Sequence, residues 1–335
     1  MNTLKMPTTD ALVLEEAGGN FIKKTIDIPV TGPGQVKVEI YASGVNPLDT
    51  KIWSGQAGHA KQTLPAVLGM DLAGKVIEKG SHVHKFEIGD EVFGLVGGVG
   101  GNQGTLAQFA IVDEALLAKK PTNMSMVEAA AIPLIFITAW EGLVDRAKVG
   151  QNKTVLIQAG AGGVGHMAIQ IAKAFGADVY ATSFPEDYDL IRRYGAIPIA
   201  FEQMESVDYL NTYTNSEGFD IIFDTLGGTF LDAAFKAVKI YTGHVVTSLG
   251  WGTHALSPLS FRGATYSGIF TLLPLITGKG KTHHGEILNE ATQLIESGKL
   301  VVRLHPENYT FENVNEAHSL VRNGKAKGKV IIRVK

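Results

Sequence analysis

The sequence predicts an α/β protein in which a strand-rich domain accompanies a doubly wound parallel sheet of six strands. Two observations predict the sheet: a strand, a glycine-rich turn and a helix follow one another over residues 153–176, and strands alternate with helices from there to residue 270. A third predicts the other domain, because the first 120 residues hold short strand patterns broken by turn residues. A chain of 335 residues is long for one core. We therefore expect two domains, one of residues 1–126 with 271–335 and one of residues 127–270.

The strands of the first domain are predicted from alternation. Residues 36–40 alternate apolar and polar side chains, as a half-buried strand does, between breakers at 32–34 and 43–44. Further strands are expected at 74–78, 91–95 and 106–112. Residues 94–104 hold six glycines in eleven positions, which predicts either a flexible surface loop or a mobile rim of a substrate cleft.

The elements of the second domain follow from residue 126 onward. A helical pattern at 127–131 is interrupted by Pro133 and resumes at 138–147. After the first strand at 154–158, we expect five more strands, at 179–182, 196–200, 219–224, 243–249 and 264–270. Helices are expected at 166–175, 187–194, 230–238 and 285–297. The last strand, 329–334, is expected to return to the first domain.

Composition excludes several classes of function. Hydrophobic residues make up 45% and charged residues 19%, the net charge is −3, and no basic stripe is present. Neither nucleic acid nor a membrane surface is therefore an expected partner. The chain has no cysteine, which excludes disulfides, thiolate catalysis and cysteine-bound zinc. With no secretory signal and no apolar run long enough to span a bilayer, we expect a cytoplasmic protein.

The turn between the first strand and helix of the second domain has the spacing of a dinucleotide-binding site. Gly160, Gly162 and Gly165 give the pattern G-x-G-x-x-G, with Gly163 and Val164 between them. A pyrophosphate needs a backbone without Cβ atoms at the positive end of a helix. The position between strand and helix makes this pattern specific and predicts nicotinamide dinucleotide binding.

The next strand bears on the choice between NADP and NAD. An acidic residue about 20 positions beyond the first glycine bonds the ribose of NAD. Here that place holds Thr182 and Ser183, two hydroxyl donors, and no carboxylate. NADP(H) is therefore favoured over NAD(H). Arg192 and Arg193 either reach the 2′-phosphate or are solvated helix charges.

Several motifs, taken in chain order, together resemble one family. The chain resembles the medium-chain dehydrogenase/reductase superfamily in its zinc-free, quinone oxidoreductase-like branch. The resemblance covers nearly the whole length and rests on residues 44–49, 68–74, 89–94, 134–143, 159–165, 224–228 and 324–330. It implies a GroES-like, mostly β substrate domain and a central Rossmann domain. Within these motifs, Asp71 and Asp90 are expected to be structural.

The same resemblance shows which residues occupy the positions of the zinc ligands. Zinc-dependent relatives hold their catalytic metal with a cysteine and a histidine where this chain has Asn46 and Met70. A carboxamide and a thioether are poor zinc ligands, so we expect no zinc and disfavour alcohol dehydrogenation.

Further site residues are implied by the resemblance. Asn46 would face the nicotinamide, although an asparagine before proline is also an ordinary turn residue. Thr138, at a helix start, would lie beside the nicotinamide ribose, or would simply cap the helix. The backbone of Phe270, Thr271 and Leu272 would hold the carboxamide. After the fifth strand, Leu249 would contact the cofactor.

The chain also departs from the family pattern. Quinone reductases commonly carry a tyrosine where this chain has Lys51, followed by Trp53. Lys51 is a candidate catalytic cation or a solvated lysine, and Trp53 and Trp251 are candidate walls of the substrate pocket. Phe201 replaces a tyrosine that often helps to hold the 2′-phosphate, which weakens the case for NADP.

These observations favour an NADPH-dependent, zinc-independent reductase of quinones or α,β-unsaturated carbonyls. The alternatives are an enoyl thioester reductase, a zinc-type alcohol dehydrogenase and a non-catalytic NADPH-binding redox sensor. The resemblance also implies a homodimer in which residues 264–270 pair across a twofold axis.

Overall fold

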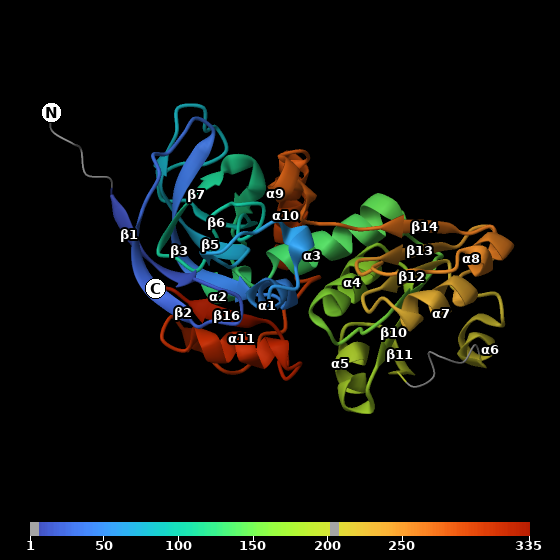
Figure 1. Ribbon diagram of the computed structural model, residues 1–335. Coiled ribbons are helices and arrows are strands. Elements are labelled where there is room, and N and C mark those ends of the chain that lie inside the picture. The colour runs from blue at the N-terminus through green and yellow to red at the C-terminus, as the bar shows by residue number, and fades with distance from the viewer. Residues whose placement is uncertain (1–6, 202–207) are drawn as a thin grey trace, which may run out of the picture. The chain divides into compact units, whose positions relative to one another are not determined.

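The computed structural model describes residues 7–201 and 208–335 of the chain (Figure 1). Its contacts divide it into two compact units. The first unit comprises Met1–Leu134 with Leu272–Lys335, and the second comprises Ile135–Thr271. The sequence analysis placed these boundaries at 126/127 and 270/271.

The first unit is built mainly from antiparallel strands. A seven-stranded sheet has the order β15-β16-β3-β5-β6-β8, with β7 paired to β3, and a three-stranded sheet has the order β2-β1-β4. The strands are β1 (Thr8–Leu14), β2 (Phe21–Asp27), β3 (Gln35–Val45), β4 (Ala66–Val67), β5 (Asp71–Lys79), β6 (Glu91–Leu95), β7 (Phe109–Asp113), β8 (Leu117–Lys119), β15 (Tyr309–Thr310) and β16 (Val330–Arg333). The last strand, β16, pairs antiparallel with β3. This pairing confirms that the end of the chain returns to the first domain.

Short helices complete the first unit. They are α1 (Pro47–Trp53), η1 (Gly58–Ala60), η2 (Glu114–Leu116), α2 (Met126–Ala129), α9 (Leu273–Thr277), α10 (Lys281–Glu296) and α11 (Val314–Arg322). The sequence analysis anticipated α10 but missed α1, α11, β1 and β2. None of the described helices is long and apolar enough to cross a membrane.

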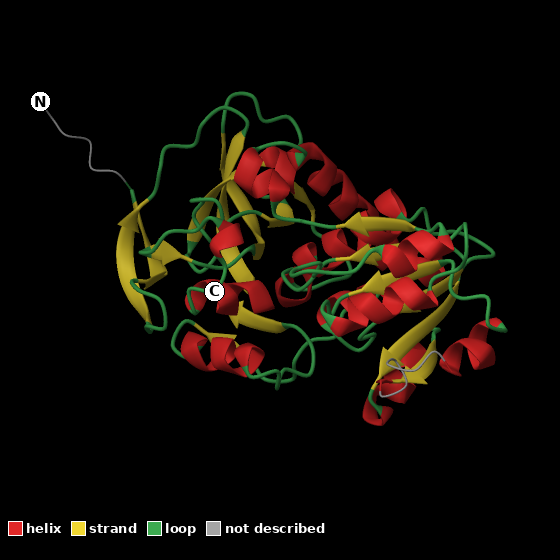
Figure 2. Cartoon of the chain, turned by 45° about the vertical axis from the view of Figure 1, so that its right-hand side comes forward, coloured by secondary structure: helices red, strands yellow, loops and turns green. Residues whose placement is uncertain are grey.

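The second unit contains a parallel sheet of six strands, as predicted. Its order is β11-β10-β9-β12-β13-β14. The strands are β9 (Thr154–Ile157), β10 (Asp178–Ser183), β11 (Ile197–Ala200), β12 (Ile221–Asp224), β13 (His244–Thr247) and β14 (Thr265–Gly268). The helices are α3 (Pro133–Trp140), the π-helix η3 (Glu141–Arg146), α4 (Gly163–Ala174), η4 (Pro185–Asp187), α5 (Tyr188–Arg193), α6 (Asp208–Thr214), α7 (Thr229–Ala237) and α8 (Ser257–Arg262). Figure 2 shows these helices in red beside the yellow strands.

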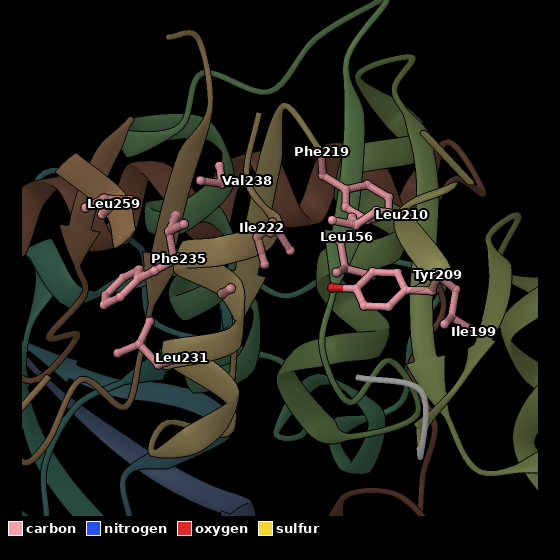
Figure 3. Close-up of a cluster of buried hydrophobic side chains, with 13 residues drawn as sticks. Leu156, Ile199, Tyr209, Leu210, Phe219, Ile222, Leu231, Phe235, Val238 and Leu259 are labelled. Carbon is pink, nitrogen blue, oxygen red and sulfur yellow. The ribbon is translucent and has the colours of Figure 1, made fainter. Parts of the chain in front are cut away.

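Both faces of the central strands of this sheet are buried, which explains why those strands are nearly continuously apolar. Leu156 of β9 and Ile222 of β12 join a cluster with α6, α7 and α8, in which Phe219 and Phe235 are fully buried (Figure 3). The neighbours of Leu156 along β9, Val155 and Ile157, are buried too but lie outside that cluster. A strand buried on both faces packs helices on both sides, as a doubly wound sheet requires.

Two sequence predictions are corrected by the fold. The helix break expected at Pro133 is present, since α2 ends at Ala129, but the next helix, α3, begins at Pro133 itself and not at residue 138. Proline suits that place because the first helical turn leaves its N–H groups unpaired and proline lacks that group. Thr138 consequently lies inside α3 and is neither a helix start nor an N-cap.

The glycine-rich segment 94–104 is also different from expectation. It is packed rather than loose, since residues 92–99 are all buried. A Cβ atom on Gly97 would lie 1.9 Å from the carbonyl oxygen of Gln103. Several of these glycines therefore allow close packing of main chain on main chain, which a composition count cannot distinguish from flexibility.

Candidate functional site

The glycine turn connects β9 to α4 in the second unit. A Cβ atom on Gly165 would lie 2.1 Å from the carbonyl oxygen of Ala159, and one on Gly160 would lie 2.6 Å from the Cβ atom of Ala181. These two glycines are therefore required by the packing of the turn itself. Gly162 caps α4 and Gly163 begins it, and both are exposed. The turn thus presents bare backbone at the start of a twelve-residue helix, which is the arrangement that binds a pyrophosphate.

Thr182 and Ser183, at the end of β10, have different roles. The hydroxyl of Thr182 accepts a hydrogen bond from the Ala159 N–H at 2.9 Å, and its carbonyl accepts one from the Gly160 N–H at 2.8 Å. Thr182 therefore holds the glycine turn against β10. The Ser183 side chain is buried, with 4% of the residue exposed, and its hydroxyl has no partner among the described residues.

An unpartnered buried hydroxyl is costly, because it has lost water without gaining a hydrogen bond. Ser183 stands where a dinucleotide fold binds the adenosine ribose. The bare turn and this hydroxyl together fit a nicotinamide dinucleotide.

Aromatic side chains and a paired arginine surround the end of β10. Phe184 lies 5.0 Å from Phe201 between ring centroids, and Phe201 lies 5.2 Å from Phe230. Arg192 is engaged by Asp189 at 2.9 Å and by the ring of Tyr188.

A second group of predicted residues meets where α3 and the end of the second unit come together. The hydroxyls of Thr138 and Thr271 are 3.1 Å apart, and Thr271 also donates to Glu141 at 3.2 Å. Phe270 contacts Trp251 edge to face, with ring centroids 6.2 Å apart, and Trp251 is 50% exposed. The structure therefore brings Thr138, Phe270, Thr271 and Trp251 close to one another within one unit.

Leu249 follows β13 and belongs to a neighbouring turn. Its N–H donates to the hydroxyl of Thr247 at 3.0 Å. That hydroxyl donates in turn to Asp224, which also accepts from the N–H groups of Leu226 and Gly227. Burial raises the pKa of Asp224 above its ordinary value. Asp224 thus fixes the carboxyl ends of β12 and β13, where a doubly wound sheet places its ligands. Leu272, at the start of the last segment of the first unit, is buried.

Asn46 belongs to a buried network in the first unit, which was not anticipated. Its Nδ2 donates to Asp71 Oδ2 at 2.8 Å, and its Oδ1 accepts from Lys329 Nζ at 2.6 Å. Lys329 also pairs with Asp71 at 3.1 Å. Asn46 and Asp71 are 0% exposed, and Lys329 is buried as well. The amide orientation of Asn46 is therefore fixed from both ends, which leaves one Nδ2 hydrogen for any other acceptor.

Asp49 and Asp71 also anchor the main chain around this network. Asp49 accepts from the N–H groups of Asn46 at 2.8 Å and Gly69 at 3.2 Å, and Asp71 accepts from the Leu134 N–H at 2.8 Å. Burial raises the pKa of Asp49 to about 7, with the charge of Asp71 acting in the same direction. We call Asn46, Asp49, Asp71 and Lys329 the Asn46 network.

The other two predicted residues of the first unit lie on α1. Lys51 is exposed in the last turn of that helix. The indole of Trp53 donates to the Gly19 carbonyl at 2.7 Å, and the Arg322 guanidinium lies 4.1 Å from the ring centroid. Trp53 thus docks α11 against α1, a structural role that stands beside its expected place in a substrate pocket.

Comparisons with known proteins agree with this geometry. The alcohol dehydrogenase GroES-like domain model matches residues 32–122, and the zinc-binding dehydrogenase model matches residues 195–332. A 2-methylene-furan-3-one reductase of Solanum lycopersicum is 35% identical over 323 residues, covering 93% of this chain and 74% of the relative. The chloroplastic NADPH-dependent alkenal/one oxidoreductase of Arabidopsis thaliana is 34% identical over 332 residues, covering 96% and 78%.

A solved structure extends the similarity over the whole fold. An alcohol dehydrogenase superfamily protein from Novosphingobium aromaticivorans is 53% identical with a TM-score of 0.95, covering 98% of this chain and 100% of that one. The chain belongs to the medium-chain dehydrogenase/reductase superfamily. It falls in the zinc-free branch and is an oxidoreductase of that superfamily.

Asn46 and Met70 occupy the two positions at which zinc-dependent relatives are expected to hold their catalytic metal. Asn46 is committed to Asp71 and Lys329, and Met70 is fully buried. Over residues 7–201 and 208–335, no three histidine, aspartate or glutamate side chains gather as a metal site would require. The donors at these positions do not fit zinc.

The sequence reasoning missed Lys329 as a partner of Asn46. A signal existed, because Lys329 is a charged residue directly before the apolar residues 330–332, and a buried lysine needs a counter-charge. Nothing local in the sequence says that the counter-charge is Asp71.

Proposed function

We propose that this protein is an NADPH-dependent reductase of α,β-unsaturated carbonyls and quinones that needs no zinc. The observation that carries the proposal is the bare glycine turn, together with the buried hydroxyl of Ser183, which has no partner within residues 7–201 and 208–335. Relatives named as NADPH-dependent alkenal/one oxidoreductase and 2-methylene-furan-3-one reductase support the substrate class.

The residues of the second unit would hold the cofactor. NADPH, when bound, supplies the hydride. The N–H groups at Gly162, Gly163 and Val164 would bind its pyrophosphate at the start of α4. The hydroxyl of Ser183 would donate to the 2′-phosphate, while Thr138 and the segment 270–272 would contact the nicotinamide end.

NADPH is proposed over NADH because no carboxylate ends β10. A carboxylate there would bond the ribose hydroxyls of NADH and repel a 2′-phosphate. The strand ends instead in Thr182 and Ser183, with the partly exposed Phe184 after them. Phe201, which packs against Phe184 and Phe230, has no side-chain donor to offer a 2′-phosphate.

On the substrate side, we propose Lys51 as the group that meets the negative charge developing on the acceptor oxygen. Lys51 is exposed and forms no ion pair with any described residue, so its ammonium is open to a ligand. Asn46, held by Lys329 and Asp71, would contribute its single remaining N–H. No metal is required for this step.

The test is a screen of purified protein with NADPH and NADH against enals, enones and quinones. We expect oxidation of NADPH with at least one enone or quinone. Lys51→Met should lower kcat by about 10²-fold, since an oxyanion donor is worth that much, while the exposed Lys299→Met should have no effect. Tight binding of NADPH with no turnover of any acceptor would instead indicate a non-catalytic NADPH-binding protein.

We also propose a homodimer formed through β14. This strand is at the edge of the sheet and pairs only with β13. Near it, Tyr241 and Phe261 are 85% and 86% exposed, and the Tyr241 N–H bonds to the carbonyl of Arg262. An open edge with exposed aromatic side chains suits a second copy of the chain. Sedimentation should show a dimer at micromolar concentration, and a monomer there would refute the proposal.

A further inference from the structure

The first unit contains a cavity that shares only Lys329 with the Asn46 network and shares no residue with the glycine turn. Its volume is about 410 Å³, and it is lined by the start of α2, the loop 304–308 and one face of β16. This volume lies within the range of about 300–1,000 Å³ that small-molecule sites occupy.

The face of β16 that lines the cavity combines charge with an apolar surface. Side chains alternate along a strand, so Lys329, Ile331 and Arg333 share this face. Val127 and Leu304 complete the apolar part of the lining. The cavity therefore has an apolar wall between two cationic residues.

The ring of His305 carries a buried N–H donor that has no acceptor among the described residues. Its Nδ1 accepts from the Lys327 N–H at 3.1 Å, so the ring proton belongs on Nε2. The side chain is only 7% exposed, and Nε2 has no hydrogen-bond partner among the described residues. The nearest carboxylate oxygen, on Glu307, is 3.9 Å away and Glu307 already accepts from Tyr309. A buried N–H in this position is stabilised by a ligand that brings an acceptor.

Some of the charged side chains that line the cavity already have partners within the protein, and one does not. Lys329 is paired with Asp71, and Glu128 accepts from the N–H and the hydroxyl of Ser125 at 2.8 and 2.7 Å. The guanidinium of Arg333 has no ion pair or hydrogen bond within the described part of the chain. Arg333 is therefore the charge that remains available to a ligand.

We propose that this cavity binds a small monocarboxylate that carries a second acceptor oxygen. The carboxylate pairs with Arg333, the second oxygen accepts from His305 Nε2, and a short hydrocarbon part packs on Ile331 and Val127. A single negative charge is specified because Glu128 and Glu307 also line the cavity and repel a phosphate dianion. This proposal does not depend on the proposed reductase activity.

Isothermal titration calorimetry with four probes tests the proposal: 2-oxobutyrate, butyrate, butanone and inorganic phosphate. We expect 2-oxobutyrate to bind most tightly, butyrate to bind more weakly because it lacks the second acceptor, and butanone and phosphate not to bind. Arg333→Gln should weaken both carboxylates by about tenfold or more, since it removes a charged hydrogen bond. The exposed Lys325→Gln serves as a control and should change neither.

His305→Phe separates the two contacts. It should weaken 2-oxobutyrate by about fivefold and leave butyrate unchanged, because only the first ligand uses Nε2. Thermal melts of each variant show whether it is folded. The proposal is overturned if 2-oxobutyrate does not bind saturably, if phosphate binds more tightly, or if folded Arg333→Gln binds as the wild-type protein does.

Discussion

The glycine turn of the second unit and the Asn46 network of the first unit differ in how many of their polar groups have hydrogen-bond partners. The turn works through main chain: Gly162 and Gly163 are exposed, and the nearby Ser183 hydroxyl has no partner in the part of the chain that the structure describes. The network works through buried side chains that pair with one another and leave one N–H of Asn46 unused. Unpaired polar groups give the turn its capacity to bind a ligand, whereas paired ones give the network its capacity to hold Asn46 in one orientation.

The largest effect is expected from a methyl group in the turn. Gly165→Ala would place a Cβ atom 2.1 Å from the Ala159 carbonyl oxygen, a distance that no rotamer can relieve. Because the obstacle is main chain, the turn must change shape and lose its cofactor geometry. We expect NADPH binding, measured by fluorescence titration, to fall below detection.

Gly163→Ala is the matched control within the same turn. Its Cβ atom would meet nothing closer than Ile135 Cγ2 at 3.4 Å, an ordinary contact. This variant should melt within a few degrees of the wild-type protein. If Gly165→Ala melted at the same temperature as Gly163→Ala, the packing argument for the turn would be wrong.

The second prediction removes the cation of the Asn46 network. Lys329→Met leaves Asp71 buried and without its counter-charge, so the free energy of unfolding should fall by about 3–5 kcal/mol. Urea denaturation measures this change. Adding Asp71→Asn to Lys329→Met removes the unpaired charge and should restore part of the loss. A double variant no more stable than the single one would show that the network is not held by charge.

These two sites also differ in how far the sequence predicts them. The turn and its strand and helix lie within residues 153–176, so local pattern was sufficient to predict both fold and ligand. Lys329 and Asn46 are 283 residues apart, and only the pairing of β16 with β3 brings them together. No periodicity in one segment contains that information.

Between these extremes lie residues whose type was predicted but whose role was not. Thr182 and Ser183 were both expected to donate to the cofactor. Successive side chains of a strand point to opposite faces, so one hydroxyl meets the glycine turn and the other does not. The helix break expected at Pro133 is present, but the next helix begins five residues earlier than expected, since the residue type that interrupts a helix also begins one.

The third prediction concerns the pH dependence of stability. The folded protein raises the pKa of Asp49 to about 7 from an ordinary 3.8, so the folded state binds more protons between these values. The free energy of unfolding contributed by Asp49 therefore decreases as pH rises from about 4 to about 7 and is constant above that. Asp49→Asn lacks this decrease.

The difference between wild type and Asp49→Asn isolates the effect. Burial lowers the pKa of His318 to about 4, so stability from His318 is lost as pH falls below its ordinary 6.5, in the opposite direction. His318 is present in both proteins and cancels from the difference. Urea denaturation from about pH 4.5 to 7.5 should show the wild-type advantage shrinking with pH. A constant difference across this range would contradict the raised pKa.

The smallest effect is expected from Ser183→Ala, which removes one hydroxyl near the glycine turn. Ser183→Ala should raise the KM for NADPH about fivefold, the value of one hydrogen bond, and leave the KM for NADH unchanged. Thr182→Val, by contrast, removes the anchor of the Ala159 N–H and should weaken both cofactors and lower the melting temperature. Steady-state kinetics with each cofactor distinguishes the two. If Ser183→Ala changed the KM for NADPH and the KM for NADH equally, the hydroxyl would not contact the 2′-phosphate. The preference for NADPH would then have to come from another residue.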